Sequence, residues 1–412
     1  MVNQITLSNG LRVIAEPLPH LRSVSIGVWV RAGSILEKPE ENGLSHFIEH
    51  LAFKGTARRS ARQIAQEMDA VGGYLNAATS KLATTYYAKV IDEDLPLAAD
   101  ILADIVIHPA YDEREMNKER SVVLEEISMT DDSPEDVAYD LVATAMFGDQ
   151  PLGRTILGPR EIIESCSRQD ILNYRARHYS PMNACVAVAG NFETEKLRDI
   201  LEQHFGAWQG RAGELYPVNI TNRNPAVLTA DKDTEQAHIC LGYSGRELGS
   251  QDVYAMAVFN SVLGGGMSSR LFQRIREESA MAYSVYSAPS AYPYCGDFTV
   301  YAAVSPKNVR TVVSQIDEEI AKLLNDGITE EEFKMAKAQL KGGFILGQES
   351  AYNRMNGMGS NLALLNRYIP TEETIRRIEA VTRQDAQRIA EETLRGPRSE
   401  AYVGKKIGKY VK

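Results

Sequence analysis

An internal repeat constrains this chain more than any other feature of its sequence. The stretch YAKVIDEDLPLAADILADIV, which begins at Tyr87, aligns with YAAVSPKNVRTVVSQIDEEI, which begins at Tyr301. The charged stretches that begin at Asp112 and Thr329 then fall opposite one another. A repeat of about 200 residues indicates one supersecondary plan used twice. Because 412 residues exceed one ordinary domain of about 150 residues, the repeat predicts two domains of similar fold.

Both halves alternate strand-like runs with longer helical segments. Strands are expected at 23–30 and 84–91, and again at 238–243 and 298–304. Helical spacing predicts helices at 42–53, 60–71, 95–107, 112–129, 252–263 and 309–324. This order favours an α+β class, in which each domain has a mostly antiparallel sheet with helices packed on one face.

The domain boundaries follow from composition. Residues 209–224 are rich in Gly, Asn and Arg and have no clear hydrophobic period, which is typical of a linker. The predicted organisation is a catalytic domain over 1–208, a linker over 209–224 and a second, metal-free domain over 225–412 that contributes substrate contacts.

Charge and composition argue against several classes of protein. A net charge of −10 does not suit a nucleic-acid partner, which needs a basic face. No apolar run approaches the roughly 20 residues of a membrane span, and residues 1–10 lack the pattern of a signal peptide, so a cytoplasmic protein is expected. The 4 cysteines are far apart and form no C-x-x-C pair, which argues against a disulfide scaffold and a zinc ribbon.

One motif carries recognisable chemistry: the pattern H-x-x-E-H, formed by His46, Glu49 and His50. On a helix the two histidines are one turn apart and share a face, and the glutamate lies beside them. Two imidazoles so placed can bind one zinc ion, and the carboxylate can reach a water molecule on that ion. With only 7 histidines in the chain, a chance occurrence has a probability of about 0.02. The sequence therefore predicts a zinc site.

A catalytic zinc usually has three protein ligands and one open position. The charged helix predicted over 112–129 offers Glu119, Glu125 and Glu126, of which Glu119 and Glu126 share a face because they are seven residues apart. Glu126 follows His50 by 76 residues. With this spacing the chain resembles the inverted-motif zinc peptidases, the family that includes pitrilysin, insulysin and the mitochondrial processing peptidases.

The resemblance implies roles for five residues. His46, His50 and Glu126 would be the zinc ligands, Glu49 the general base and Glu119 a catalytic carboxylate that supports the site. In the aligned second half these polar residues are replaced, which implies one Zn²⁺ per chain. The residues at or near the corresponding places are Met256, Phe259, Asn260 and Gly343.

The likeness extends to segments that bind the substrate in this family. The run from Gly72 to Ala77 looks like the family's substrate-binding edge strand, which implies that Asn76 and Ala77 hold the peptide main chain to main chain. Arg276 and Tyr283 match the family's Arg/Tyr pair that contacts the substrate backbone. A peptide substrate is therefore expected.

Two further features qualify the resemblance. Asp136 and Asp140, one helical turn apart, look like the acidic pair by which processing peptidases recognise an arginine near the cleavage site, and they are equally consistent with a solvated helix face. The chain departs from the family at Leu82, where a glutamate is usual, and near Ala280, where a glycine is usual.

These observations predict a zinc-dependent endopeptidase similar to the short-chain bacterial members of the family, cleaving peptides or unfolded presequence-like segments that are basic or contain arginine. The long-chain relatives look like four repeats of this domain in one chain, whereas this chain has two. We therefore expect a homodimer, in which two chains related by symmetry supply the four repeats. The alternative from another class is a non-catalytic structural or assembly subunit of the same fold, and a third possibility is a zinc hydrolase that does not act on peptides.

Overall fold

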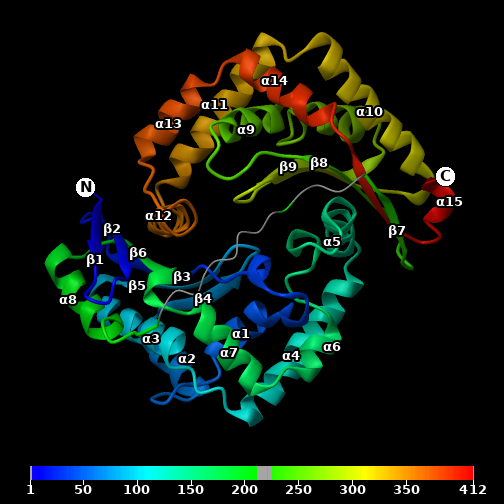
Figure 1. Cartoon of the computed structure of the whole chain (residues 1–412). Coiled ribbons are helices and arrows are strands. Elements are labelled where there is room, and N and C mark those ends of the chain that lie inside the picture. The colour runs from blue at the N-terminus through cyan, green and yellow to red at the C-terminus, as the bar shows by residue number, and fades with distance from the viewer. Residues whose placement is uncertain (1, 211–219, 221–224, 412) are drawn as a thin grey trace. The chain divides into compact units, whose positions relative to one another are not determined.

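The computed structural model describes residues 2–210, 220 and 225–411 and divides the chain into two compact units (Figure 1). The first unit comprises Met1–Ile127, Thr155–Val218 and Leu346–Ile369. The second comprises Ser128–Arg154, Asn219–Ile345 and Pro370–Lys412. Most of the linker expected at 209–224 lies outside the described residues.

The first unit is built on a sheet of six strands. Their order across the sheet is β1 (Asn3–Thr6), β2 (Arg12–Pro17), β6 (Ala184–Gly190), β3 (Ser23–Val30), β5 (Thr84–Ile91) and β4 (Tyr74–Thr79). The pair β2–β6 is parallel, and the other neighbours are antiparallel. Because β4 pairs only with β5, its other side is an open edge of the sheet.

Helices of the first unit gather mainly on one side of this sheet (Figure 1). They are α1 (Leu44–Ala52), α2 (Ala61–Ala70), α3 (Leu95–Ile107), α4 (Glu113–Asp132), α6 (Arg160–Ser165), α7 (Arg168–His178) and α8 (Thr194–Phe205). Apolar side chains of α1 and α3 pack with alternate residues of β3 and β5, such as Val28 and Tyr86, in one buried cluster. Alternation along the strands leaves the other side chains, such as Trp29, for the second face.

The second unit repeats the sheet with one strand fewer. The order is β7 (Val227–Asp231), β11 (Ser399–Gly404), β8 (Ala237–Ser244), β10 (Gly296–Val304) and β9 (Ala282–Ala291). Here too one pair, β7–β11, is parallel and the rest are antiparallel. Its helices are α5 (Pro134–Phe147), α9 (Asp252–Leu263), α10 (Val309–Asp326), α11 (Glu330–Gly347), α13 (Thr371–Ala380), α14 (Arg383–Leu394) and α15 (Gly408–Val411), with a π-helical turn at Phe272–Glu278.

The shared topology agrees with the repeat read from the sequence, and the predicted α+β class is confirmed. The structure adds one helix to the second face of each sheet, and each of these helices comes from the other half of the chain. Helix α12 (Ala351–Leu365) packs on β2, β3 and β6, where Gly359 lies so close to Trp29 that a Cβ atom would collide with the ring. Helix α5 packs on β7, β8 and β11.

This exchange is why the compact units differ from the contiguous ranges 1–208 and 225–412 expected from the sequence. The α12 side chains Met355 and Met358 are buried with Trp29, Cys185 and Ala187 of the first sheet. An amphipathic pattern predicts that a helix has an apolar face, but it does not say which sheet that face covers. Within the described ranges, no helix combines the length and apolar character needed to cross a bilayer.

Candidate metal centre

The N-terminus of α1 is held by a buried carboxylate. Glu37 is only 3% exposed, and its two oxygens accept hydrogen bonds from the backbone N–H of Gly43 at 2.8 Å and of Ser45 at 2.7 Å. The side-chain amide of Asn42 donates a third at 3.0 Å. Gly43 has a φ of +101°, a conformation that glycine adopts without steric cost. Burial raises the pKa of Glu37, although these hydrogen bonds oppose the shift.

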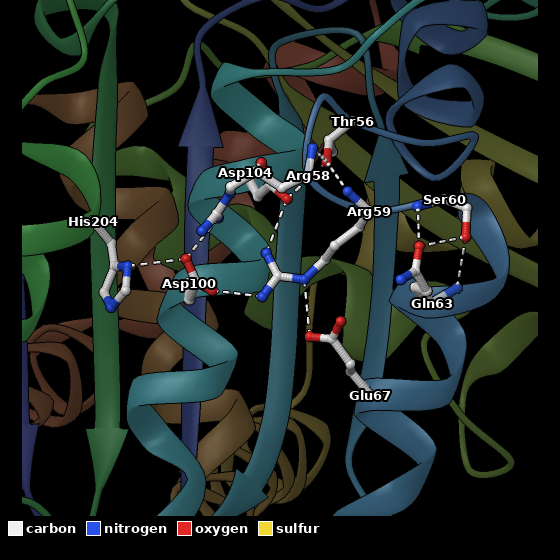
Figure 2. Close-up of polar contacts among 9 residues, drawn as sticks. All are labelled: Thr56, Arg58, Arg59, Ser60, Gln63, Glu67, Asp100, Asp104 and His204. Atoms are coloured by element: carbon white, nitrogen blue, oxygen red, sulfur yellow. Dashed lines mark hydrogen bonds and ion pairs between the residues drawn. The ribbon is translucent and has the colours of Figure 1, made fainter.

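The loop after α1 is tied to α3 by a second network (Figure 2). Thr56 Oγ1 donates to Asp104 Oδ2 at 2.8 Å, and Arg59 donates to the same oxygen at 2.9 Å. Arg58 and Arg59 also reach Asp100, at 2.6 and 2.5 Å. Asp104 is fully buried, and buried carboxylates persist when charged donors satisfy them. Both ends of α1 are therefore fixed to the body of the first unit.

Between these anchors, the helix brings three ligand atoms together with α4. His46 Nε2 lies 3.2 Å from His50 Nε2. One carboxylate oxygen of Glu126, Oε2, lies 3.6 Å from the first nitrogen and 3.3 Å from the second. Within the described ranges, these three residues are the one group of three or more His, Cys, Asp or Glu side chains whose ligand atoms lie mutually within 4.8 Å.

These spacings fit a tetrahedral metal ion. Zinc–ligand bonds of about 2.0–2.1 Å at tetrahedral angles place neighbouring ligand atoms about 3.4 Å apart. The three observed edges bracket that value. Glu119 Oε1 lies 2.8 Å from His50 Nδ1. Because a carboxylate can only accept, Nδ1 carries the proton and Nε2 keeps its lone pair for a metal.

The same contacts set the charge of the site. Burial and the neighbouring His50 lower the pKa of His46 to about 4, so its imidazole is neutral at physiological pH. Burial acts to lower the pKa of His50, but the hydrogen bond to Glu119 and the charges of Glu126, Glu119 and Glu49 outweigh it and raise that pKa. Lys54 Nζ approaches Glu119 Oε2 at 2.6 Å, so Glu119 lies between a lysine and a histidine. Although Glu119 is buried, which acts to raise its pKa, these two partners hold that pKa below its usual range.

Glu49 lies beside the ligand atoms on the same helix and has one firm partner. Thr79 Oγ1, at the end of β4, donates to Glu49 Oε2 at 2.6 Å. Burial raises the pKa of Glu49 above its usual value, which favours a carboxylate able to take up a proton near neutral pH. Thr79 and Lys54 were not predicted from the sequence. Their contacts arise from tertiary packing, and the one available signal for Lys54 was its place four residues after His50.

Asn76 and Ala77 lie on the open edge strand β4, as the sequence predicts. The Asn76 side chain is exposed, and its amide donates to the Tyr74 hydroxyl at 2.8 Å. The backbone N–H of Ala77 donates to Asn76 Oδ1 at 2.9 Å. A side chain of the same strand thus takes this N–H, which indicates that the Ala77 backbone faces the open edge. Leu82, half-buried, lies in the turn between β4 and β5.

The other predicted residues belong to the second unit. Asp136 lies in the first turn of α5, where its N–H donates to Ser133 Oγ, and Asp140 follows one turn later. The Arg276 guanidinium lies 5.6 Å from the centre of the Tyr283 ring. Ala280 has a φ of +51°, a conformation that favours glycine and accounts for the glycine usual near this position. The structure thus gathers five of the predicted residues in the first unit at one centre.

This centre and the repeated fold define a class of metallopeptidase. Residues 12–160 match the family described as insulinase (peptidase family M16), and residues 165–340 match the family described as the peptidase M16 inactive domain. The chain belongs to peptidase family M16, which confirms the resemblance seen in the sequence, and its cofactor is zinc.

Particular relatives agree with this placement. The chain is 42% identical to the "uncharacterized zinc protease YmxG" of Bacillus subtilis, over 92% of this chain and 93% of the relative. It is 40% identical to an "uncharacterized zinc protease" of Mycobacterium leprae, over 98% of this chain and 92% of the relative. The crystal structure of a protease from Helicobacter pylori matches with a TM-score of 0.93 and 24% identity, covering 98% of this chain and 99% of that one, and supports the fold.

Proposed function

We propose that this protein is a zinc-dependent endopeptidase whose zinc ligands are His46, His50 and Glu126. The observation that carries the proposal is the triangle of three ligand atoms, with edges of 3.2, 3.3 and 3.6 Å. A carboxylate on the same helix that is not one of the three ligands, that of Glu49, provides the base that a hydrolase of this kind needs. Membership of a peptidase family and relatives named as zinc proteases support the choice of a peptide bond as substrate.

Zinc, when bound, supplies a Lewis acid that acidifies water and polarises the scissile carbonyl. Glu49 then removes a proton from the attacking water and returns it to the leaving amine. The hydrogen bond from Thr79 fixes one oxygen of Glu49 and leaves the other to receive the proton. Glu119 orients His50 through Nδ1, and Lys54 in turn fixes Glu119.

The substrate is proposed to add to the free edge of β4 as an extra strand. The backbone of Ala77 faces that edge, where its N–H is held by the Asn76 side chain, so an added peptide strand would replace Asn76 Oδ1 as the acceptor of this N–H and leave Asn76 to contact the peptide. Because Thr79 of the same strand reaches Glu49, a peptide paired with β4 passes the catalytic carboxylate at the strand's end. Main-chain pairing of this kind accepts many sequences, which suits a peptidase of unfolded segments.

Glu49→Gln tests the function. The amide keeps the shape of the carboxylate but cannot take up a proton, so the variant is expected to retain zinc and lose cleavage of a quenched peptide. Zinc content is measured by metal analysis with and without a chelator, and cleavage by fluorescence. Full activity in Glu49→Gln would reject the assigned base, and absence of cleavage by the zinc-loaded wild type would favour the non-catalytic subunit.

We also propose that the acidic pair Asp136 and Asp140 favours peptides with arginine near the scissile bond. Replacing both with asparagine should weaken cleavage of arginine-containing peptides, and added salt should do the same in the wild type because it screens charge. Neutral peptides serve as the control. An equal loss of cleavage on both classes of peptide would show that the pair is only part of a solvated helix face.

Two repeats per chain suggest a homodimer, in which Arg276 and Tyr283 of one chain serve the zinc site of its partner. In mixed dimers of Glu49→Gln and Arg276→Ala chains, one of the two sites carries neither defect, so each mixed dimer should have about half of the wild-type activity. A freely exchanging 1:1 mixture should therefore approach about a quarter of the wild-type value, because half of its dimers are mixed. If the pair acted within its own chain, every site would keep one defect and mixing would restore nothing. Native mass spectrometry checks that the subunits exchange.

A further inference from the structure

An aromatic row lies across the face of the first sheet that α12 partly covers. Tyr74 of β4 and Tyr87 of β5 have ring centres 6.2 Å apart, and Tyr87 and Tyr352 of α12 have ring centres 5.1 Å apart. The row ends at the open edge of the sheet with Tyr74, which is 54% exposed. An aromatic ring so exposed at an unpaired strand is available to a ligand that pairs with that strand.

Strand alternation separates this row from the zinc ligands. Ala77 is buried in the cluster that contains α1, and Thr79 reaches Glu49, so these two side chains of β4 point to the α1 face. Tyr74 and Asn76 point to the opposite face, because successive side chains alternate. A peptide added to β4 would likewise place alternate side chains on the two faces, and those on the second face would meet Tyr74.

From this arrangement we infer that Tyr74, with Tyr87 and Tyr352 behind it, forms a subsite for a large apolar side chain of the substrate, away from the scissile bond. The inference rests on the proposed endopeptidase function. Tyr74 precedes Thr79 by five residues, or about 17 Å along a strand. The recognised side chain therefore lies about five residues from the bond that is cut.

The charge beside the row selects the class of side chain. Lys89 is the residue of β5 directly opposite Tyr74, is exposed, and shares its face of the sheet. The positive charge of a lysine opposite Tyr74 disfavours a guanidinium or ammonium group, although either could otherwise stack on tyrosine. A neutral aromatic or large aliphatic side chain meets no such penalty and buries apolar surface against the ring.

On the corresponding face of the second unit, the position that corresponds to Tyr74 holds no aromatic side chain. Tyr301 corresponds to Tyr87, and its neighbour Tyr286 donates to Glu135 at 2.8 Å and receives a hydrogen bond from Tyr139 at 2.9 Å. In the equivalent sheet register, the place of Tyr74 is taken by Ser284, opposite Ala303. The aromatic groups on that face are joined to α5, and the exposed ring of the edge strand β9, that of Tyr283, lies outside the position that corresponds to Tyr74.

The test uses a series of quenched peptides made of small residues, each with one phenylalanine at a different position. For each peptide, kcat/KM is divided by the kcat/KM of the peptide that has small residues only. In the wild type the ratio should rise about 10-fold when phenylalanine stands about five residues from the cleaved bond, which corresponds to partial burial of one aromatic side chain. Tyr74→Ser, which copies the second unit, should bring the ratio close to 1, and Tyr74→Phe should keep it. Arginine at the same position should give a lower ratio than phenylalanine.

Tyr294→Ser is the matched control, because Tyr294 is similarly exposed, at 51%, and lies in the second unit. A ratio that survives Tyr74→Ser, falls equally in Tyr294→Ser or favours arginine would overturn the subsite. Binding of the same peptides to zinc-loaded Glu49→Gln, followed by fluorescence anisotropy, provides a readout without cleavage. Tyr74-dependent binding with no cleavage by the wild type would reject the endopeptidase and retain the subsite.

Discussion

Helix α1 of the first unit and helix α9 of the second follow corresponding strands of two sheets with the same topology, yet their chemistry is opposite. Where α1 presents His46 and Glu49, α9 buries Met256 and Phe259 in an apolar core, at 2% and 0% exposure. Asn260 occupies the position of α9 that corresponds to His50, and its side-chain oxygen accepts a hydrogen bond from Ser287. The fold therefore supplies the position of a helix, and a few side chains decide whether that helix binds metal.

The same contrast separates α4 from α11. Glu126 of α4 offers the third candidate ligand atom, whereas Gly343 stands at the aligned place of α11 with open space where a side chain would begin. A glycine there removes the ligand without disturbing any packing. Duplication thus leaves one copy free to lose the metal while it keeps its sheet and its core.

The largest expected effect comes from giving the first unit the residues of the second. His50→Asn and Glu126→Gly should each abolish zinc binding and, with it, cleavage, because two protein ligands do not complete a catalytic zinc site. Metal analysis of the purified variants measures the loss. Asn260→Ala is the control and should leave the zinc content at the wild-type value. If both first-unit variants retained zinc, these residues would not account for the difference in metal binding between the two units.

A smaller effect is expected from Lys54→Met, which removes the partner of Glu119 but preserves length and apolar volume. Loss of an outer partner of a metal ligand typically lowers metal affinity about 10- to 100-fold. Competition with a chromogenic chelator gives the affinity. Lys118→Met, which removes an exposed ion pair with Glu115 on α4, is the control. Equal affinities in the two variants would show that Glu119 needs no support from Lys54.

Glu37→Gln tests how much the buried carboxylate at the start of α1 contributes to stability and to zinc affinity. The NH2 group of the glutamine amide cannot accept a hydrogen bond from a backbone N–H group, as a carboxylate oxygen of Glu37 does. The free energy of unfolding should therefore fall by about 1–3 kcal/mol. Zinc affinity should fall as well, because the first turn of the ligand helix loosens. Glu332→Gln disrupts a similar cap on α11 of the second unit and should lower stability alone. Urea unfolding and chelator competition separate the two effects.

The smallest effect concerns acid stability. Burial raises the pKa of Asp100, but hydrogen bonds from Arg58 and Arg59 outweigh it and hold that pKa below its usual range. The stabilisation is therefore complete above the pKa of the unfolded chain, about 3.9, and disappears as pH falls through the lower folded-state value. The difference in urea midpoint between wild type and Asp100→Asn should be constant near neutral pH and shrink below about pH 4. Asp69→Asn, on an exposed part of α2, should show no such trend.

The predictable part of the site is local in the chain. His46, Glu49 and His50 lie within two turns of one helix, so their spacing alone predicts a shared face. Thr79 and Glu37 could not be predicted in this way, since strand pairing and loop packing bring them to α1. The repeat correctly predicted two similar sheets, because each segment shows its hydrophobic periodicity in the sequence itself. It did not predict that α5 and α12 pack on the sheet of the other half.

That exchange has a consequence for how the protein is made. A ribosome releases the strands of the first sheet long before α12, so the face that carries Trp29 and Cys185 stays uncovered until residue 365 has been synthesised. Helix α5 emerges early, and the sheet that it covers stays incomplete until β11, at residues 399–404, has been added. Neither unit can complete its core during the first three quarters of translation. Nascent chains are therefore expected to depend on holding chaperones until synthesis is nearly finished.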